Sequence, residues 1–500
     1  MIKARKTILI AAVMYVLTLA AYFTIEAILT GGSGTIGKNR GNPVVAAQED
    51  TLKRMGDLDY GTDDYRQGLD LSCRGCNVLF INIDLLRADQ VGLLNPAGNH
   101  TPNIDRFFEK SIIFEQAQAP AGDTYSSNIA VLTASEVVDI LETRYFDPSY
   151  KYQPATIQEK LADGGYYTLN LNQGDYSGRA TRMDVGFEGY VQIEDRAPPN
   201  DSVALMIEKI RSEARKPFFT LYHPDTLHHP YDFPRNYLER IDMDDQFIST
   251  FYEFRRDKLW IGFAVPKEYS SKVIEGPLEK IDEDSILYVV FQDEYNRRIN
   301  FTYRNRESMF RYYSLKVEYT DGELAPLLKF IDDELGNDTI VVLYANHGES
   351  LSDNKQFQHG VSYQSCVHVP LMIKHPKVKE QVRVKRPVSL IDLAPTIYEM
   401  LGIYQGNISS FSLISVIKDD EYDREFIYGK SYKDEYILRG DWKLITSTQR
   451  GKELYNMRTD PKEQYNIIAQ HQEIAALLDA ELSREKMSSI SQGEMGGIGT

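Results

Sequence analysis

The chain contains few cysteines, and that scarcity limits what can hold the fold together. Three cysteines occur among its 500 residues, at Cys73, Cys76 and Cys366. Three are too few for the disulfide framework of a small secreted domain. The close pair Cys73 and Cys76 has no second Cys or His pair that would complete a structural zinc site. Two interpretations of this pair are left open: two incidental thiols, or one local bridge.

Basic residues are also fewer than acidic residues. Lys and Arg number 56 against 73 Asp and Glu, so the formal net charge is -17. A surface with that balance repels nucleic acids and anionic lipid headgroups, which excludes a broad basic binding face, and we expect no nucleic-acid partner. An anionic substrate would have to be held by local groups or by a metal ion.

Apolar and aromatic residues are plentiful by contrast. Hydrophobic residues make up 42% of the chain, which includes 33 Tyr and 21 Phe. A chain of this composition can bury a large core, so we expect it to be folded almost throughout.

One long apolar run lies at the N-terminus. Lys3, Arg5 and Lys6 precede a stretch that is almost free of charge over residues 7–29, close to the roughly 20 residues of a membrane-spanning helix. We predict a transmembrane signal anchor there, with residues 1–6 as a cytoplasmic basic flank and the rest of a single-pass membrane protein on the extracytoplasmic side. No clear small-x-small cleavage site follows, which favours an anchor over a removed signal peptide.

The pattern beyond the anchor predicts three further parts. Residues 30–76 lack periodicity and are typical of a polar tether. Strand and helix patterns then alternate over residues 77–403, with a charged, aromatic insertion at about 235–305. Such alternation predicts an α/β fold with a mainly parallel central sheet and helices on both faces. Over residues 404–500 we expect a small antiparallel sheet, built around a Gly-Asp turn, and a terminal helix.

Two apolar runs of this predicted sheet end on residue types that bind metals. The run NVLFINID ends at Asp84, and TIVVLYANHG ends at Asn346 and His347. Ligands of open α/β sheets gather beyond the carboxyl ends of buried parallel strands. We therefore expect these side chains to share one crevice and one cation.

Several separated blocks, taken in order, resemble the sulfatase family of the alkaline phosphatase superfamily, and the resemblance covers nearly all of the chain after Asn77. They include NVLFINIDLLRADQVG, TPNIDRFFEKSIIFEQAQAP, TYSSNIAVLTA, YHPDTLHHPYDFP, LYANHGESLSDNKQFQHG and ELYNMRTDPKEQYNI. The resemblance implies an alkaline phosphatase-like fold.

The resemblance also implies a nucleophile. Thr124 stands where typical sulfatases carry the Cys or Ser that becomes formylglycine, and Ser126 and Asn128 replace the usual Pro and Arg. Thr cannot supply that aldehyde by the same route. Thr124 instead resembles the Thr nucleophile of phosphoglycerol and phosphoethanolamine transferases, whose hydroxyl attacks phosphorus and forms a covalent phospho-enzyme.

A single divalent metal ion is implied as the cofactor, with Asp84, Thr124, Asn346 and His347 as ligands. Asn346 replaces a family Asp, and Leu85 sits where many sulfatases have a second Asp. The lost carboxylates weaken attraction for the cation, while the imidazole favours Mn, Zn or Mg over Ca, so the identity of the ion stays open. The alternative is that Asn346 and His347 only cap the following turn.

Two further histidines match family blocks. His228 in HHPY and His359 in QHG occupy positions that face the substrate anion in relatives, and either can protonate a leaving oxygen. His223 and His229 are ambiguous. Arg87 resembles a family Arg that pairs with carboxylates near the metal rather than with substrate.

These features predict a membrane-anchored, extracytoplasmic, metal-dependent hydrolase or transferase that cleaves a phosphate or sulfate ester. Phosphoryl chemistry fits Thr124 best. One alternative is a sulfuric ester hydrolase in the broad family sense, and another is a degenerate, non-catalytic binding protein with the same fold. The substrate, whether a glycan, a lipid headgroup or a small molecule, is not readable from the sequence.

Overall fold

A computed structural model of the chain describes a large part of it. The described residues are 51–52, 55, 66, 68–136, 154–173, 184–193, 199–215, 217–228, 262–263, 286–292, 297–351, 353–403, 410–432 and 434–495. The chain divides into two compact units, Met1–Arg54 and Met55–Thr500, and the fold below is that of the second. The predicted anchor at 7–29 and its flank at 1–6 lie outside the described residues.

Among the described helices, none is both long enough and apolar enough to span a membrane.

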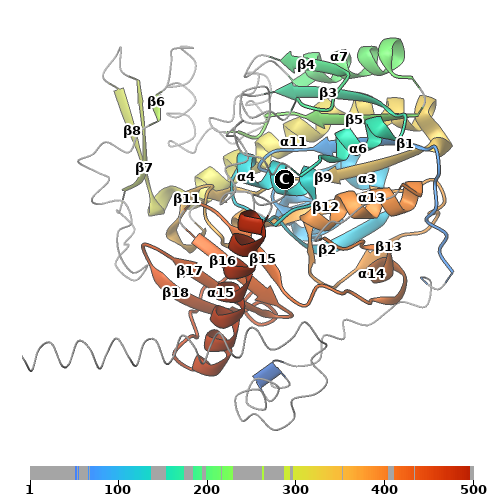
Figure 1. Cartoon of the computed structure of the whole chain (residues 1–500). Coiled ribbons are helices and arrows are strands. Elements are labelled where there is room, and N and C mark those ends of the chain that lie inside the picture. The colour runs from blue at the N-terminus through green and yellow to red at the C-terminus, as the bar shows by residue number, and fades with distance from the viewer. Residues whose placement is uncertain are drawn as a thin grey trace, which may run out of the picture. The chain divides into compact units, whose positions relative to one another are not determined.

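The second unit is built around a mixed, mostly parallel sheet (Figure 1). Its described strands run in the order β13-β2-β12-β9-β1-β5-β3-β4, and β14 also pairs with β2. Only β12 pairs in the antiparallel sense, with β2 and β9. The bounds are β1 Asn77–Asn82, β2 Ile112–Gln118, β3 Tyr167–Gln173, β4 Gly189–Ile193, β5 Phe218–His223, β9 Thr339–Tyr344, β12 His368–Lys374, β13 Val382–Val384 and β14 Val388–Ser389.

The helices of this sheet pack in two groups. Helix α11 contacts both α3 and α7, and α4 contacts α6 and α13. Their bounds are α3 Pro102–Phe108, α4 Thr124–Thr133, α6 Ile157–Asp163, α7 Pro199–Glu213, α11 Arg306–Phe330, α12 Gln364–Val367, α13 Leu393–Leu401 and α14 Ile414–Asp419. The predicted class, a mainly parallel α/β sheet with helices, is confirmed.

Local signals in the sequence explain where helices begin and end. Helix α6 starts at a capping box, in which Thr156 and Glu159 satisfy each other's backbone N–H groups. Helix α13 stops at Gly402, whose φ of 68° suits a glycine that ends a helix.

A second, antiparallel sheet follows the first. Strands β15 Ile427–Lys430, β16 Asp434–Arg439, β17 Trp442–Ser447 and β18 Gly451–Asn456 pair in sequence order, and α15 Gln472–Met495 packs on them. Gly440, with a φ of 57°, makes the predicted turn between β16 and β17. The predicted small antiparallel sheet with a helix is therefore confirmed.

Three short strands come from the segment predicted to be an insertion. Strands β6 Gly262–Phe263, β7 Ile286–Gln292 and β8 Arg297–Thr302 form an antiparallel sheet of their own. Most other residues of the 235–305 segment lie outside the described part of the chain.

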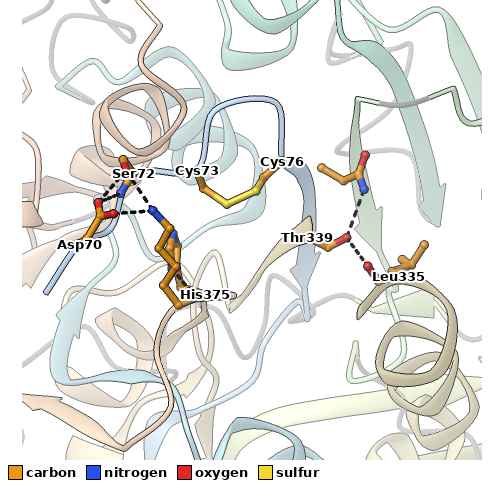
Figure 2. The surroundings of a disulfide bond; sticks show 9 residues. Asp70, Ser72, Cys73, Cys76, Leu335, Thr339 and His375 are labelled. Carbon is orange, nitrogen blue, oxygen red and sulfur yellow. Dashed lines mark hydrogen bonds and ion pairs between the residues drawn. A yellow bond between two sulfur atoms is a disulfide. The ribbon is translucent and has the colours of Figure 1, made fainter. Parts of the chain in front are cut away.

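Cys73 and Cys76 form a disulfide bridge directly before β1, so the local bridge is the correct one of the two interpretations (Figure 2). The backbone N–H of Cys73 donates to the carbonyl of Met400 at 2.6 Å. At the start of β1, Asn77 donates to Thr339 Oγ1 at 3.3 Å and accepts from the N–H of Phe218 at 3.2 Å. The first residue of β1 is thus hydrogen-bonded to β9 on one side and to β5 on the other.

Candidate active site

The site begins where two neighbouring strands end together. Strands β1 and β9 are parallel, with Asn82 opposite Tyr344. The N–H of Ile83 donates to the carbonyl of Tyr344 at 2.9 Å, and the N–H of Asn346 donates to Asn82 Oδ1 at 3.0 Å. Strands β1 and β9 leave the sheet at the same edge. The segments that carry Asp84 and Asn346 therefore come together, although they lie more than 260 residues apart in the sequence.

The start of helix α4 is the third segment of the site, after the segments that follow β1 and β9. Asp123 caps its N-terminus by accepting from the N–H of Ser126 at 2.9 Å, so that Thr124 is the first helical residue. Ser127 Oγ donates to the carbonyl of Asn346 at 2.6 Å, which attaches the helix to the end of β9. The apolar residues from Ile129 to Leu132 continue the helix into the core.

Three predicted metal ligands are in mutual contact. The hydroxyl of Thr124 lies 3.2 Å from Asp84 Oδ2 and 3.0 Å from His347 Nε2, and that nitrogen lies 3.3 Å from Asp84 Oδ1. Asn346, the fourth, adjoins His347 and is fully buried. The structure therefore brings Asp84, Thr124 and His347 together, and Asn346 is the buried residue directly before His347.

The tautomer of His347 follows from its neighbours. His347 Nδ1 lies 2.8 Å from the carbonyl oxygen of Gly348, which can only accept, so Nδ1 carries the proton. Burial lowers the pKa of His347 to about 4, and the ring is neutral at neutral pH. The lone pair on Nε2 then points towards Thr124.

The polar atoms around the Thr124 hydroxyl are mostly hydrogen-bond acceptors, with few protons to share among them. Burial disfavours the charged form of Asp84, but the positive charge of neighbouring imidazole groups outweighs that effect and holds the pKa of Asp84 below the usual range. Asp84 Oδ1 and both amide atoms of Asn346 have no hydrogen-bond partner among the described residues. An ionised carboxylate, an imidazole lone pair and a free amide oxygen are donors that suit a divalent cation.

The donor set is nevertheless poor in carboxylates. No cluster of three or more His, Cys, Asp or Glu suited to a metal occurs in the part of the chain that the structure describes. Leu85, where many sulfatases have Asp, is buried in the core and has a left-handed backbone with a φ of 65°. Its carbonyl accepts from the hydroxyl of Tyr313 at 2.6 Å. Leu85 thus shapes the turn after Asp84 and supplies no side-chain ligand.

The predicted catalytic histidines adjoin this group. The ring centroids of His347 and His359 lie 4.9 Å apart, and those of His359 and His228 lie 5.4 Å apart. His359 Nδ1 is 3.5 Å from Glu349 Oε2. Burial disfavours the charged ring of His359, but the Glu349 carboxylate outweighs that effect and raises the pKa of His359 to about 9. A neutral imidazole and a cationic one therefore stand side by side.

Some polar residues of the site were missed or left ambiguous in the sequence. Asn82 donates to Asn128 Oδ1 at 2.8 Å, and the amide nitrogen of Asn128 lies 3.1 Å from His223 Nε2. Burial lowers the pKa of His223. A neutral chain of hydrogen bonds thus occupies the place that the family gives to a charged Arg. The available signal for Asn82 was a polar residue at the end of an apolar strand.

Arg87 and Glu349 complete the surroundings. Arg87 pairs with Asp89 and with Asp353, each at 2.6 Å, and also donates to the carbonyl of Glu349 at 2.9 Å. This agrees with the prediction that Arg87 pairs with carboxylates. Glu349 was missed, although it follows His347 by two residues in the loop after β9.

Comparison with known proteins agrees with this architecture. The Sulfatase family model matches residues 76–403, and the model named N-sulphoglucosamine sulphohydrolase, C-terminal, matches residues 353–488. Arylsulfatase K of Bos taurus is 26% identical over 385 residues, 67% of this chain and 67% of that protein. Arylsulfatase K of Mus musculus is 30% identical over 190 residues, 34% of each. The chain thus spans between about a third and two thirds of the length of these relatives.

Solved structures show the same fold. A 2-O GAG sulfatase matches with a TM-score of 0.60 and 17% identity, over 83% of this chain and 93% of that one. The phosphonate monoester hydrolase of Agrobacterium radiobacter matches with a TM-score of 0.57 and 16% identity, over 84% and 96%. At such identities the likeness concerns the fold alone.

The protonation of His359 yields a testable prediction. Because its pKa is raised, the ring is charged at neutral pH and loses its proton only as the pH rises through about 9. Glu349→Gln removes the neighbouring negative charge, so the titration should move down towards the ordinary imidazole value of about 6.5. NMR titration of the His359 ring protons measures the change.

The matched control is Glu318→Gln, which removes the carboxylate 2.9 Å from His100 and should leave His359 unchanged. An equal pKa for His359 in the wild type and in Glu349→Gln would contradict the assignment.

Proposed function

Since the chain belongs to the sulfatase family, we propose that it cleaves a phosphate or sulfate ester with the hydroxyl of Thr124 as the nucleophile. The family model and the arylsulfatase relatives agree with the prediction of an enzyme, of the hydrolase class. The single observation that carries the proposal is the position of Thr124 Oγ1, buried between Asp84 Oδ2 and His347 Nε2.

Both neighbours of the hydroxyl are acceptors at neutral pH. The single proton of Thr124 passes to one of them as Oγ1 attacks phosphorus or sulfur. The bond from that atom to the alcohol oxygen breaks, and His359, which is protonated, gives its proton to the departing oxygen. Water then hydrolyses the covalent ester on Thr124 and restores the hydroxyl. We assign to His228, whose ring lies next to that of His359, a contact with the same anion.

Enzymes of this family generally use a divalent metal ion. We propose that Asp84, Asn346, His347 and Thr124 hold one here, since they offer lone pairs in excess of protons. When bound, such an ion lowers the pKa of a coordinated hydroxyl and neutralises negative charge on the transferred group. Its identity, whether Mn, Mg, Zn or Ca, is open.

We also propose that the folded part of the chain works outside the cytoplasm, tethered by the apolar segment at residues 7–29. The Cys73–Cys76 bridge supports this proposal, because disulfides persist in oxidising compartments and are rare in the cytoplasm.

Replacing the nucleophile tests the mechanism. Thr124→Ala should lower turnover by about 10³-fold or more, because the attacking oxygen is lost. Para-nitrophenyl sulfate, para-nitrophenyl phosphate and a phenylphosphonate ester are the substrates, and their relative rates decide between sulfate and phosphate chemistry. Mass spectrometry after a brief incubation should find a sulfated or phosphorylated peptide that contains residue 124.

The control is Thr133→Ala at the other end of the same helix, where the hydroxyl donates to the carbonyl of Ile129 at 2.7 Å. It should retain turnover. Equal turnover in Thr124→Ala and wild type would refute the mechanism, and no turnover by the wild type, together with no bound metal, would favour the non-catalytic binding protein.

The metal site can be tested without activity. Asn346→Asp adds a carboxylate of the same shape, so it should tighten binding of Mn²⁺ by about tenfold through Coulomb attraction. Calorimetric titration of the metal-free protein measures this affinity. Asn466→Asp adds the same charge in the C-terminal part, where the side-chain oxygen accepts from Leu454 N, and should leave the affinity unchanged. An unaltered affinity in Asn346→Asp would mean that residue 346 does not face the ion.

The proposed compartment has its own test. Cells that produce the protein are treated with a membrane-permeant alkylating agent before lysis, and the peptide with Cys73 and Cys76 is analysed without reduction. We expect the bridged, unalkylated form, while buried Cys366 stays a thiol. Recovery of Cys73 and Cys76 in alkylated form would argue for a reducing compartment.

A further inference from the structure

A tyrosine at the tip of the β15–β16 turn is exposed beside the proposed site. Tyr432 is 75% exposed, and among the described residues Val185 and Tyr465 are the other exposed large hydrophobic side chains. An aromatic ring with this exposure is not part of the core, so its surroundings decide what it can do.

The turn that carries Tyr432 is attached to the segment before the nucleophile. The N–H of Lys430 donates to the carbonyl of Pro120 at 2.9 Å, and Ser431 Oγ accepts from the N–H of Gly122 at 2.8 Å. From β16, the hydroxyl of Tyr436 donates to the carbonyl of Ala119 at 2.7 Å. The antiparallel sheet thereby lies against residues 119–123, which lead directly into Thr124.

The same turn borders the segment of His359. The N–H of Gly360 donates to the carbonyl of Gly122 at 2.6 Å. A Cβ on Gly122 would lie 2.3 Å from the carbonyl oxygen of Val361, so these segments touch through their backbones. A Cβ on Gly360 would lie 3.5 Å from Cδ2 of Tyr432. The Tyr432 ring therefore adjoins the residue that follows His359.

Hydrogen bonds and a buried ion pair hold the turn that carries Tyr432. Ser431 is buried, and its N–H donates to the carbonyl of Asp434 at 2.8 Å. The Asp434 carboxylate, also buried, pairs with Arg450 at 2.8 Å and accepts from the N–H of Ser362 at 3.3 Å. Because the backbone of this turn is already fixed, Tyr432 loses little backbone conformational entropy when it binds a partner. This favours its use as a contact residue.

We propose that Tyr432 contacts the alcohol part of the ester and packs against a sugar or aryl ring. This rests on the proposed function, since it assigns the specificity of that same site. A tyrosine offers an apolar face and a polar tip, which suit one face of a ring that also carries hydroxyl groups. The net charge of -17 disfavours a long polyanion, so a single ring or a short saccharide is the substrate class that fits.

The experiment measures binding in a Thr124→Ala background, where turnover does not interfere. Two probes carry a ring, para-nitrophenyl sulfate and a sulfate ester of glucosamine. The third, methyl sulfate, has no ring, and each probe is compared with the corresponding phosphate ester. Tyr432→Ala, Tyr432→Phe and Tyr465→Ala are compared by calorimetry. Tyr465 is 71% exposed in another loop of the C-terminal part and is the matched control.

We expect Tyr432→Ala to weaken binding of the ring-bearing esters by about fivefold and to leave methyl sulfate unchanged, while Tyr432→Phe and Tyr465→Ala keep the original affinity. With Thr124 intact, the same change should raise KM and leave kcat nearly constant. Equal affinities of Tyr432→Ala and its parent for all probes, or no gain of affinity from a ring in the parent, would overturn the assignment. Ring-dependent binding without turnover by the Thr124-containing protein would refute the proposed function and leave this contact standing.

Discussion

The parallel pairing of β1 with β9 is the constraint on which the site depends. Six consecutive residue pairs, from Asn77 with Thr339 to Asn82 with Tyr344, fix where the two strands end. A slip of one residue would turn every side chain to the other face of the sheet. Both strands are wholly buried, so the core enforces the register, and with it the meeting of Asp84 with His347.

Electrostatics then separates the roles of two adjacent imidazoles. His347 is buried against a carbonyl and an aspartate, and burial prevails, so its ring stays neutral. His359, less than 5 Å away between ring centroids, faces the buried carboxylate of Glu349 and is held as a cation. Neutral and charged rings at one site are what an acceptor and a proton donor need at the same pH.

The replacements relative to the family lower the charge of the site. Asn346 and Leu85 take the places of carboxylates, and Asn128 takes the place of an arginine, so negative charge and positive charge are both reduced. The amide of Asn128 instead links Asn82 and His223 by hydrogen bonds. The antiparallel sheet, through Ser431 and Gly122, closes the other side of the nucleophile turn.

The sequence by itself determined the strand and helix alternation, the antiparallel sheet with its Gly440 turn, and the family, because these rest on local periodicity, turn residues and ordered motifs. It also predicted that the residues after β1 and β9 lie close together, as Asp84 and His347 do, since parallel strands end at one edge. Tertiary structure alone decided which contacts those residues make. The tautomer of His347, the charge of His359 and the approach of Tyr432 to Gly360 depend on burial and on segments distant in sequence, and no local pattern encodes them.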